Sequence, residues 1–268
     1  MGSLNIIYNK NEKIILYFSI EQFSLAFPNP CSPIPVTGVM KHLIKRFLQK
    51  IKLYDRIEDC LGFIKTIKFN SADYWEKRYK GGGNSGAGSY NHLAKFKADY
   101  INDLIKRFGI QKVIEFGCGD GNQLSFLGVP SYVGVDVSRF TIDTCRSKFK
   151  NDPTKKFYHS TEYELDEKGD LVLSLDVIYH LIEDKVYHQY MSILFDASTR
   201  YVVIYSSNFD SSRVSMHMKH RKFTDLIENK MQRWKLLENK KNDFPYQGDY
   251  RKGTYSDFYV FELIDYYE

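Results

Sequence analysis

The chain has 268 residues and a net charge of +5, with the composition of a soluble globular protein that is rich in Tyr and Phe. No apolar run reaches the roughly 18 residues that a membrane-spanning helix needs, and the start of the chain lacks the basic segment and cleavage site of a signal peptide. Together with four cysteines that have neither zinc-finger nor thioredoxin spacing, these features favour a cytoplasmic protein with reduced thiols and no metal.

The first 70 residues carry the whole net charge, because they contain ten Lys and Arg against five Asp and Glu. Residues 1–37 are expected to be irregular, since four of the seven prolines lie within 28–35. Residues 38–54 are expected to form a helix with one apolar face and a basic remainder. The favoured interpretation is a helix docked on the main domain with its basic face in water. The alternative is peripheral contact with an anionic membrane surface or another polyanion.

The middle of the chain predicts an α/β domain. Residues 79–90, YKGGGNSGAGSY, indicate either a linker or a loop that closes over a site as a lid. A helix is then expected from Asn91 to about Gly109. Short apolar runs alternate with helix-length segments beyond it, which indicates a doubly wound, mostly parallel sheet. The predicted strands are 112–116, 131–136, 156–160, 170–175, 200–207, 233–239 and 256–264. Helices are expected after the first strand, from the second strand through residue 145, and over 187–195 and 219–230. The last two strands are expected to form an antiparallel pair.

One turn in this region, VIEFGCGDGNQL at residues 113–124, has three alternating glycines directly after a strand. Such a turn presents backbone N–H groups and lets a ligand approach closely. A dinucleotide fingerprint that starts at Gly117 would need its third glycine at position 122, which is Asn122. Acids follow at the ends of two later strands, Asp136 and Asp176. Asp136 could instead cap the next helix, although Ser138 competes for that role.

This order of residues resembles motif I and the following acids of class I, Rossmann-like S-adenosylmethionine-dependent methyltransferases, over about residues 92–207. The resemblance implies a seven-stranded α/β sheet with an antiparallel last strand, and S-adenosylmethionine as the cofactor. It divides the chain into a helical and extended appendage at 1–70 and a catalytic domain at 71–268. The implied cofactor contacts are Glu115, Gly117, Cys118, Gly119, Gly121, Asp136, Val137, Asp176 and Val177.

The resemblance also assigns roles. In the family, the residue at the place of Asp136 accepts both ribose hydroxyls, and the one at the place of Asp176 lies beneath the methionine part of the cofactor. Glu115 corresponds to an organising residue near the cofactor amine. Cys118 is expected to be a small residue tolerated in a tight turn rather than a nucleophile. Many members also hold the adenine amino group with an acid after the third strand. The candidates for that role here are Ser160, Thr161 and Glu162.

The residues after the fourth strand indicate the chemistry of the acceptor. Family members that methylate planar amines usually carry Asn/Asp-Pro-Pro-Tyr/Phe there, whereas this chain has DVIYH, which argues against N-methylation. Transfer to a hydroxyl needs a base, and histidine, with a pKa of about 6.5, suits proton removal at neutral pH. The candidate catalytic bases are His180, His217 and His220. Each alone is more often a packing residue, but together they indicate a functional role for at least one. The candidate acceptor-binding residues are Tyr179, Arg213, Arg221, Tyr74 and Trp75.

Several segments, among them NSGAGSYNHLAKFKADYIN and HMKHRKFTD, look like methyltransferase domains that accompany bacterial or viral surface-glycan assembly. This resemblance implies O-methylation of a sugar, a glycan or a nucleotide sugar. One alternative is an RNA methyltransferase that uses the basic N-terminal segment, against which the neutral charge balance of the body counts. Another is a non-catalytic partner protein with the same fold. A metal-dependent sugar methyltransferase would need converging acids, for which Asp176 and Asp184 are the visible candidates.

Overall fold

The computed structural model describes residues 3–8, 14–19, 69–211 and 217–264. The chain divides into two compact units, Met1–Arg56 and Ile57–Glu268. In the first unit, β1 (Ser3–Tyr8) and β2 (Ile14–Ser19) pair antiparallel. The prediction that residues 1–37 are irregular is therefore wrong for these two segments, whose β-branched and aromatic residues favour strands. The basic helix predicted at 38–54 lies outside the described residues.

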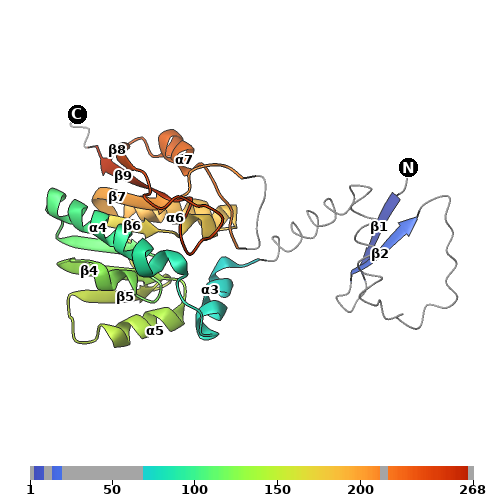
Figure 1. Ribbon diagram of the computed structural model, residues 1–268, viewed down its shortest axis with the longest axis horizontal. Helices are drawn as coiled ribbons and strands as arrows, with labels where there is room; N and C mark the ends of the chain where they lie inside the picture. Colours follow the sequence, from blue (N-terminus) through green and yellow to red (C-terminus); the bar gives the residue numbers. More distant parts are fainter. Residues whose placement is uncertain (1–2, 9–13, 20–68, 212–216, 265–268) are drawn as a thin grey trace. The chain divides into compact units, whose positions relative to one another are not determined.

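The second unit is built on a seven-stranded sheet in the order β5-β4-β3-β6-β7-β9-β8 (Figure 1). The strands from β5 to β7 in this order run parallel, whereas β9 is antiparallel to both of its neighbours. This arrangement confirms the predicted doubly wound, mostly parallel sheet with an antiparallel last strand. The strand bounds are β3 Lys112–Phe116, β4 Ser131–Asp136, β5 Lys155–His159, β6 Gly169–Leu175, β7 Ser198–Ser206, β8 Trp234–Lys240 and β9 Asp257–Leu263.

Helices cover both faces of the sheet (Figure 1). Alternating strand residues point to opposite faces, so Val113 packs in one core cluster and Ile114 in the other. The first cluster contains apolar residues of α4 and α5, and the second contains those of α6 and α7. None of the described helices combines the length and the apolarity that crossing a membrane requires. The helix bounds are α3 Ser71–Lys80, α4 Asn91–Phe108, α5 Arg139–Lys148, α6 Asp184–Asp196 and α7 Phe223–Lys230.

Two helix predictions have different outcomes. The predicted helix after residue 91 is confirmed: α4 ends where Gly109 takes a left-handed φ of 62° and donates its N–H to carbonyls of the last turn. The full helix expected after the first strand of the sheet is wrong, because only one 3-10 turn, η2 (Gln123–Phe126), forms there. Gly128 and Pro130 follow that turn at once and leave no room for a longer helix before β4.

The carboxyl ends of the parallel strands meet at one edge of the sheet. Since β4, β3 and β6 are neighbours, this edge brings together Asp136, Gly117 and Asp176, which end or follow these strands. Ligands of open α/β sheets bind at this edge. The structure therefore brings these three predicted residues together at the edge where a ligand is expected.

Candidate active site

The turn after β3 has a conformation that glycine adopts most readily. Gly117, Gly119 and Gly121 have φ values of 81°, 55° and 68°. A Cβ on Gly117 would lie 2.4 Å from a methyl carbon of Val177, which follows the neighbouring strand β6. The glycines therefore allow both the sharp turn and the close packing of Val177 against it.

Asp136, the last residue of β4, fastens this turn. Its two carboxylate oxygens accept the backbone N–H groups of Gly119 and Ser138, each at 2.9 Å. Burial raises the pKa of Asp136, although these N–H groups oppose the effect. Ser138 is the N-cap of α5, because its hydroxyl oxygen accepts the Thr141 N–H. Asp136 is therefore not needed as a helix cap, and it lines a cavity.

This first cavity has a volume of about 370 Å³, which is in the range typical of small-molecule sites. Apolar side chains from the strand ends and from α6 form much of its wall. Its polar lining includes Ser71, Ser89, Asp136, Ser160, Asp176, His180 and Glu183. Of the predicted cofactor contacts, those that line the cavity are Gly117, Asp136, Val137, Asp176 and Val177.

The other four predicted cofactor contacts, Glu115, Cys118, Gly119 and Gly121, do not line the cavity. Glu115 is 2% exposed and accepts a 2.6 Å hydrogen bond from the Tyr132 hydroxyl. Burial raises the pKa of Glu115 to about 7, and the Tyr132 hydrogen bond opposes this shift.

The thiol of Cys118 contacts that of Cys145, and this contact together with burial raises the Cys118 pKa. A thiol with a raised pKa is a poor nucleophile, in agreement with its expected packing role.

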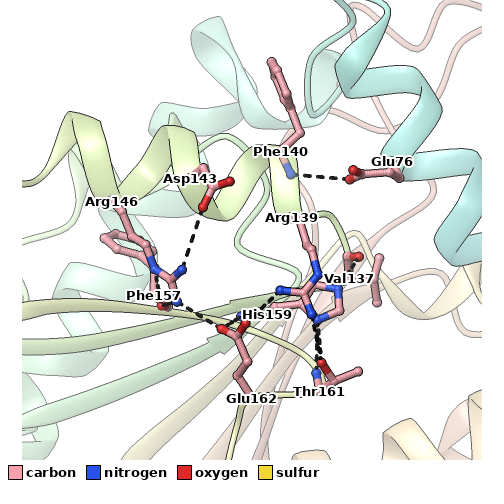
Figure 2. A network of polar contacts seen from close by, with 10 residues as sticks. All are labelled: Glu76, Val137, Arg139, Phe140, Asp143, Arg146, Phe157, His159, Thr161 and Glu162. Atoms are coloured by element: carbon pink, nitrogen blue, oxygen red, sulfur yellow. Dashed lines mark hydrogen bonds and ion pairs between the residues drawn. The ribbon is translucent and has the colours of Figure 1, made fainter.

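The loop after β5 brings a hydroxyl rather than an acid to the cavity. Ser160 lines the cavity. Glu162 forms ion pairs with Arg139 at 2.8 Å and with Arg146 at 3.0 Å. Figure 2 shows these residues in one network of polar contacts. These two arginines lower the pKa of Glu162 to about 2. Thr161 forms a 2.8 Å hydrogen bond with the neighbouring histidine ring. Ser160 is therefore the candidate that the structure places at the cavity.

Asp176 follows β6 directly and is surrounded by donors. It has a positive φ of 60°, which is uncommon for a residue other than glycine. Its Oδ2 lies 2.8 Å from Nζ of Lys97, and its Oδ1 accepts hydrogen bonds from the hydroxyls of Tyr179 and Ser256 at 3.1 and 2.9 Å. Lys97 is 1% exposed. The carboxylate is therefore fixed in one orientation, and its charge is matched by a buried lysine.

The glycine-rich segment 81–90 packs onto the motif I turn rather than acting as a linker. The Ser85 N–H donates to the carboxylate of Asp120 at 3.0 Å, and the Ser85 hydroxyl oxygen accepts the Asp120 N–H at 3.1 Å. The same carboxylate accepts the Tyr90 hydroxyl at 2.8 Å, and the Asn122 amide donates to the Ser89 carbonyl at 2.6 Å. Ser85 and Ser89 line the first cavity, so this segment forms one of its walls.

A second cavity of about 360 Å³ adjoins the first. Of the residues that the structure describes, four line both cavities: Trp75, Ser85, Asp176 and His180. The second cavity is walled by α3, the glycine-rich segment, the residues after β7 and the connection between β8 and β9. Its aromatic lining consists of Tyr74, Trp75, Tyr179, Tyr250 and Tyr255, joined by the imidazoles of His180, His217 and His220. The predicted acceptor residues Tyr74, Trp75 and Tyr179 are thus brought together here.

The three predicted bases occupy different places. His180 lies on the wall that the two cavities share, and its Nδ1 lies 2.8 Å from the carbonyl oxygen of His217. Burial lowers the pKa of His180 to about 4, although this hydrogen bond opposes the shift. His217 stacks on Tyr74 with ring centroids 5.4 Å apart, and His220 Nδ1 lies 2.7 Å from the Ser207 hydroxyl. These two histidines line the second cavity but not the first.

The structure does not bring Arg221 to either cavity. Its guanidinium donates to the carbonyls of Leu181 and Ile182 and pairs with Asp184 at 2.6 Å. These bonds occupy the guanidinium, which stabilises the connection between β6 and α6. The placement of Arg221 therefore gives no support to its expected role in acceptor binding. Asp184 lines neither cavity, so it does not converge with Asp176 as the metal-dependent alternative would require. Arg213 lies outside the described residues.

Some residues of the site were not among the predicted ones. Lys97 carries a recognisable signal, because it lies on the buried face of α4 between Leu93 and Ile101. A lysine there requires a buried partner. Arg78 lines the second cavity. The sequence does not single it out, because it is one of several basic residues in the last turn of α3. Tyr255 reaches the cavity from the long β8–β9 connection, and no local pattern predicts that reach.

Comparisons with known proteins agree with this geometry. A family model described as a methyltransferase domain matches residues 40–242. The N-methyltransferase NodS from Bradyrhizobium japonicum, solved with S-adenosylhomocysteine, is 13% identical with a TM-score of 0.55, over 73% of this chain and 99% of that one. Magnesium protoporphyrin IX methyltransferase from Synechocystis, with bound S-adenosylmethionine, is 13% identical with a TM-score of 0.51, over 73% and 98%. The methyltransferase domain of bacterial CtHen1 is 18% identical with a TM-score of 0.50, over 64% and 100%. No curated protein matches the chain.

The first cavity fits S-adenosylmethionine. Asp136 presents a buried carboxylate to the cavity, where it can accept ribose hydroxyls in addition to its two backbone N–H groups. Val137 and Leu165 offer apolar surface suited to adenine. Gly117, which has no side chain, lets a ligand approach the backbone. With the family match over most of the chain, these features show that the chain belongs to the methyltransferase domain family and is a class I S-adenosylmethionine-dependent methyltransferase.

Proposed function

We propose that the enzyme methylates a hydroxyl of a sugar, a glycan or a nucleotide sugar, with His180 as the general base. The observation that carries this proposal is the position of His180 on the wall shared by the two cavities. Bound S-adenosylmethionine supplies a methyl group on a positively charged sulfur, which is already electrophilic. Alignment of the acceptor and removal of its proton are left to the side chains of the chain.

His180 is arranged to accept a proton. A carbonyl oxygen can only accept a hydrogen bond, so Nδ1 of His180 carries the ring hydrogen toward His217 and Nε2 keeps its lone pair. The lowered pKa of about 4 keeps the ring neutral at pH 7. A neutral imidazole that is oriented through its other nitrogen can take the proton from the acceptor hydroxyl. A positioned general base typically contributes about 10² to 10⁴ in rate, and most when its pKa lies near the working pH, so a pKa of about 4 places His180 at the lower end of this range.

The environment of Asp176 supports a hydroxyl rather than an amine acceptor. A carboxylate has about four lone-pair sites, and a residue that held the hydrogens of an amine acceptor would need more than one of them free. Here the carboxylate already receives the ammonium of Lys97 and the hydroxyls of Tyr179 and Ser256. The residues after it, Val177 and Ile178, replace the proline pair of the amine-methylating members. Asp176 is therefore held in one orientation, and of the three histidines at the acceptor cavity His180 is the one that also lines the cofactor cavity.

The aromatic lining of the second cavity supports a sugar as the acceptor. Tyr and Trp present flat apolar faces with a polar edge, which suits the alternating apolar faces and hydroxyls of a pyranose ring. Tyr74 is already stacked on His217, and Trp75 contacts the His180 ring edge-on with centroids 4.9 Å apart. Tyr255 lines the same cavity and is 43% exposed, so part of its surface is open to a ligand.

The proposal is tested by transfer of radiolabelled methyl groups from S-adenosylmethionine into separated host fractions of glycan, nucleotide sugar, RNA, protein and small molecules. We expect label in a glycan or nucleotide-sugar fraction. His180→Gln should then reduce kcat by about 10² or more while S-adenosylhomocysteine still binds. The matched control is His188→Gln, since His188 is exposed on α6 and lines neither cavity. Label confined to RNA, or full turnover by His180→Gln, would overturn the proposal.

A further inference from the structure

We propose that the acceptor carries a phosphate or carboxylate group and that Arg78 binds this group in the second cavity. The inference rests on the proposed methylation of a sugar hydroxyl and narrows its substrate class to charged sugars. Arg78 lies in the last turn of α3 and lines the second cavity together with His180. One acceptor molecule in that cavity can therefore contact both residues.

Arg78 is held in place while part of its guanidinium stays free. Its Nε donates to the carbonyl of Asn84 at 2.9 Å, and the guanidinium lies over the Trp75 ring with its carbon 5.5 Å from the centroid. A Cβ on Gly83 would lie 2.8 Å from Cγ of Arg78, so the glycine lets the loop close against the arginine stem. The two terminal nitrogens form no hydrogen bond to any residue that the structure describes. They are suited to bind two oxygens of a phosphate or carboxylate.

Among the described residues that line the second cavity, Arg78 is a charge without an ion-pair partner. Asp176 is the one carboxylate among the described residues that line it, and the buried ammonium of Lys97 neutralises that carboxylate. Within residues 69–211 and 217–264, no carboxylate lies at ion-pairing distance from Arg78. Among the described residues of this cavity, Arg78 is the cation without a carboxylate partner, and with the aromatic walls it complements a ring-shaped acceptor that has one anionic group.

Binding of an anion would also act on the base. Besides burial, which is the larger cause, the positive charge of Arg78 helps to lower the pKa of both His180 and His217. An anion bound to Arg78 cancels part of this charge. His180 would then be a stronger base when the correct acceptor is bound than when the cavity is empty.

The test is calorimetric titration of the full chain, saturated with S-adenosylhomocysteine, with glucose 1-phosphate, glucuronate and glucose. We expect the phosphate ester or the carboxylate, or both, to bind more tightly than glucose, and the stronger probe identifies the anion. Arg78→Gln should weaken that binding roughly 10- to 100-fold, and Arg78→Lys should weaken it less. Lys77→Gln, an exposed neighbour on α3, is the matched control and should change nothing.

Two results would overturn the inference. One is that neither charged probe binds better than glucose, and the other is that Arg78→Gln binds them as the wild type does. Retained affinity for S-adenosylhomocysteine shows that the variants are folded. If labelled methyl groups enter a neutral glycan at an unchanged rate in Arg78→Gln, the proposed function stands and the anion subsite fails. If Arg78 binds the charged sugars but label enters no sugar, the subsite stands and the proposed function fails.

Discussion

Replacement of Lys97 by methionine should destabilise the catalytic unit by about 3 kcal/mol. Breaking a buried ion pair by removing one partner costs about 3–5 kcal/mol, because the other charge is left without compensation. We expect the lower end of this range, since the Asp176 side chain is 12% exposed and keeps two hydroxyl donors, Tyr179 and Ser256. For a domain of this size, the melting temperature should fall by roughly 6–12 °C.

The measurement is chemical denaturation of the wild type, Lys97→Met, Asp176→Asn and the double variant. The coupling free energy between the two positions should be about 2 kcal/mol or more, because each single variant leaves one buried group without its partner. Lys95→Met is the control: Lys95 is an exposed residue of α4, paired with Asp99 on the surface, and its loss should cost less than about 0.5 kcal/mol. A coupling below about 0.5 kcal/mol would refute the reasoning that Lys97 neutralises Asp176.

Three further predictions concern other parts of the site. With His180 as the base, kcat/KM should stay constant as the pH falls to about 5 and decline only as His180 becomes protonated near pH 4. The measurement is the pH–rate profile, and an acidic limb near pH 6.5 would show that another group is the base. Between pH 4.5 and 7, Glu115 holds a proton in the folded chain that it has lost in the unfolded chain. Stability therefore falls as the pH rises through this window, by up to about 3 kcal/mol, and denaturation at pH 5 and pH 8 should show a smaller fall for Glu115→Gln. An equal fall in both proteins would contradict the burial argument. In Gly119→Ala, the new Cβ would lie 2.3 Å from the Ser85 hydroxyl oxygen, and residue 119 would have to keep a φ of 55°. The affinity for S-adenosylhomocysteine, measured by calorimetry, should therefore drop by about tenfold or more. An unchanged affinity would contradict this prediction.

The cofactor half of the site could be predicted from sequence because its parts are local. Each element there is a strand end followed by a short motif, and strand alternation with the glycine turn fixes where Gly117, Asp136 and Asp176 meet. The same locality has a limit. Motif residues that shape the turn, such as Glu115 and Gly121, cannot be separated by sequence from those that line the cavity, because both kinds belong to one pattern.

The acceptor half could be predicted only in part, because it is assembled from distant segments. Its walls come from α3, from the residues after β7 and from the β8–β9 connection. The position of Arg221 shows the difficulty. An arginine in the segment between β7 and α7 can face a ligand or bind a neighbouring loop, and the outcome depends on where Asp184 lies. Arg78, in contrast, precedes the glycine-rich segment in sequence and reaches the cavity because α3 packs beside it.

The glycine-rich segment makes the two halves of the site depend on each other. Ser85 lines both cavities, and residues 86–88 line the second one. The segment is tied to the motif I turn through Asp120, which bonds Ser85 and Tyr90. If the segment lifts to admit the cofactor, it removes one wall of the acceptor cavity and releases Asn84 from Arg78. The acceptor cavity is therefore complete only when this segment lies against the motif I turn.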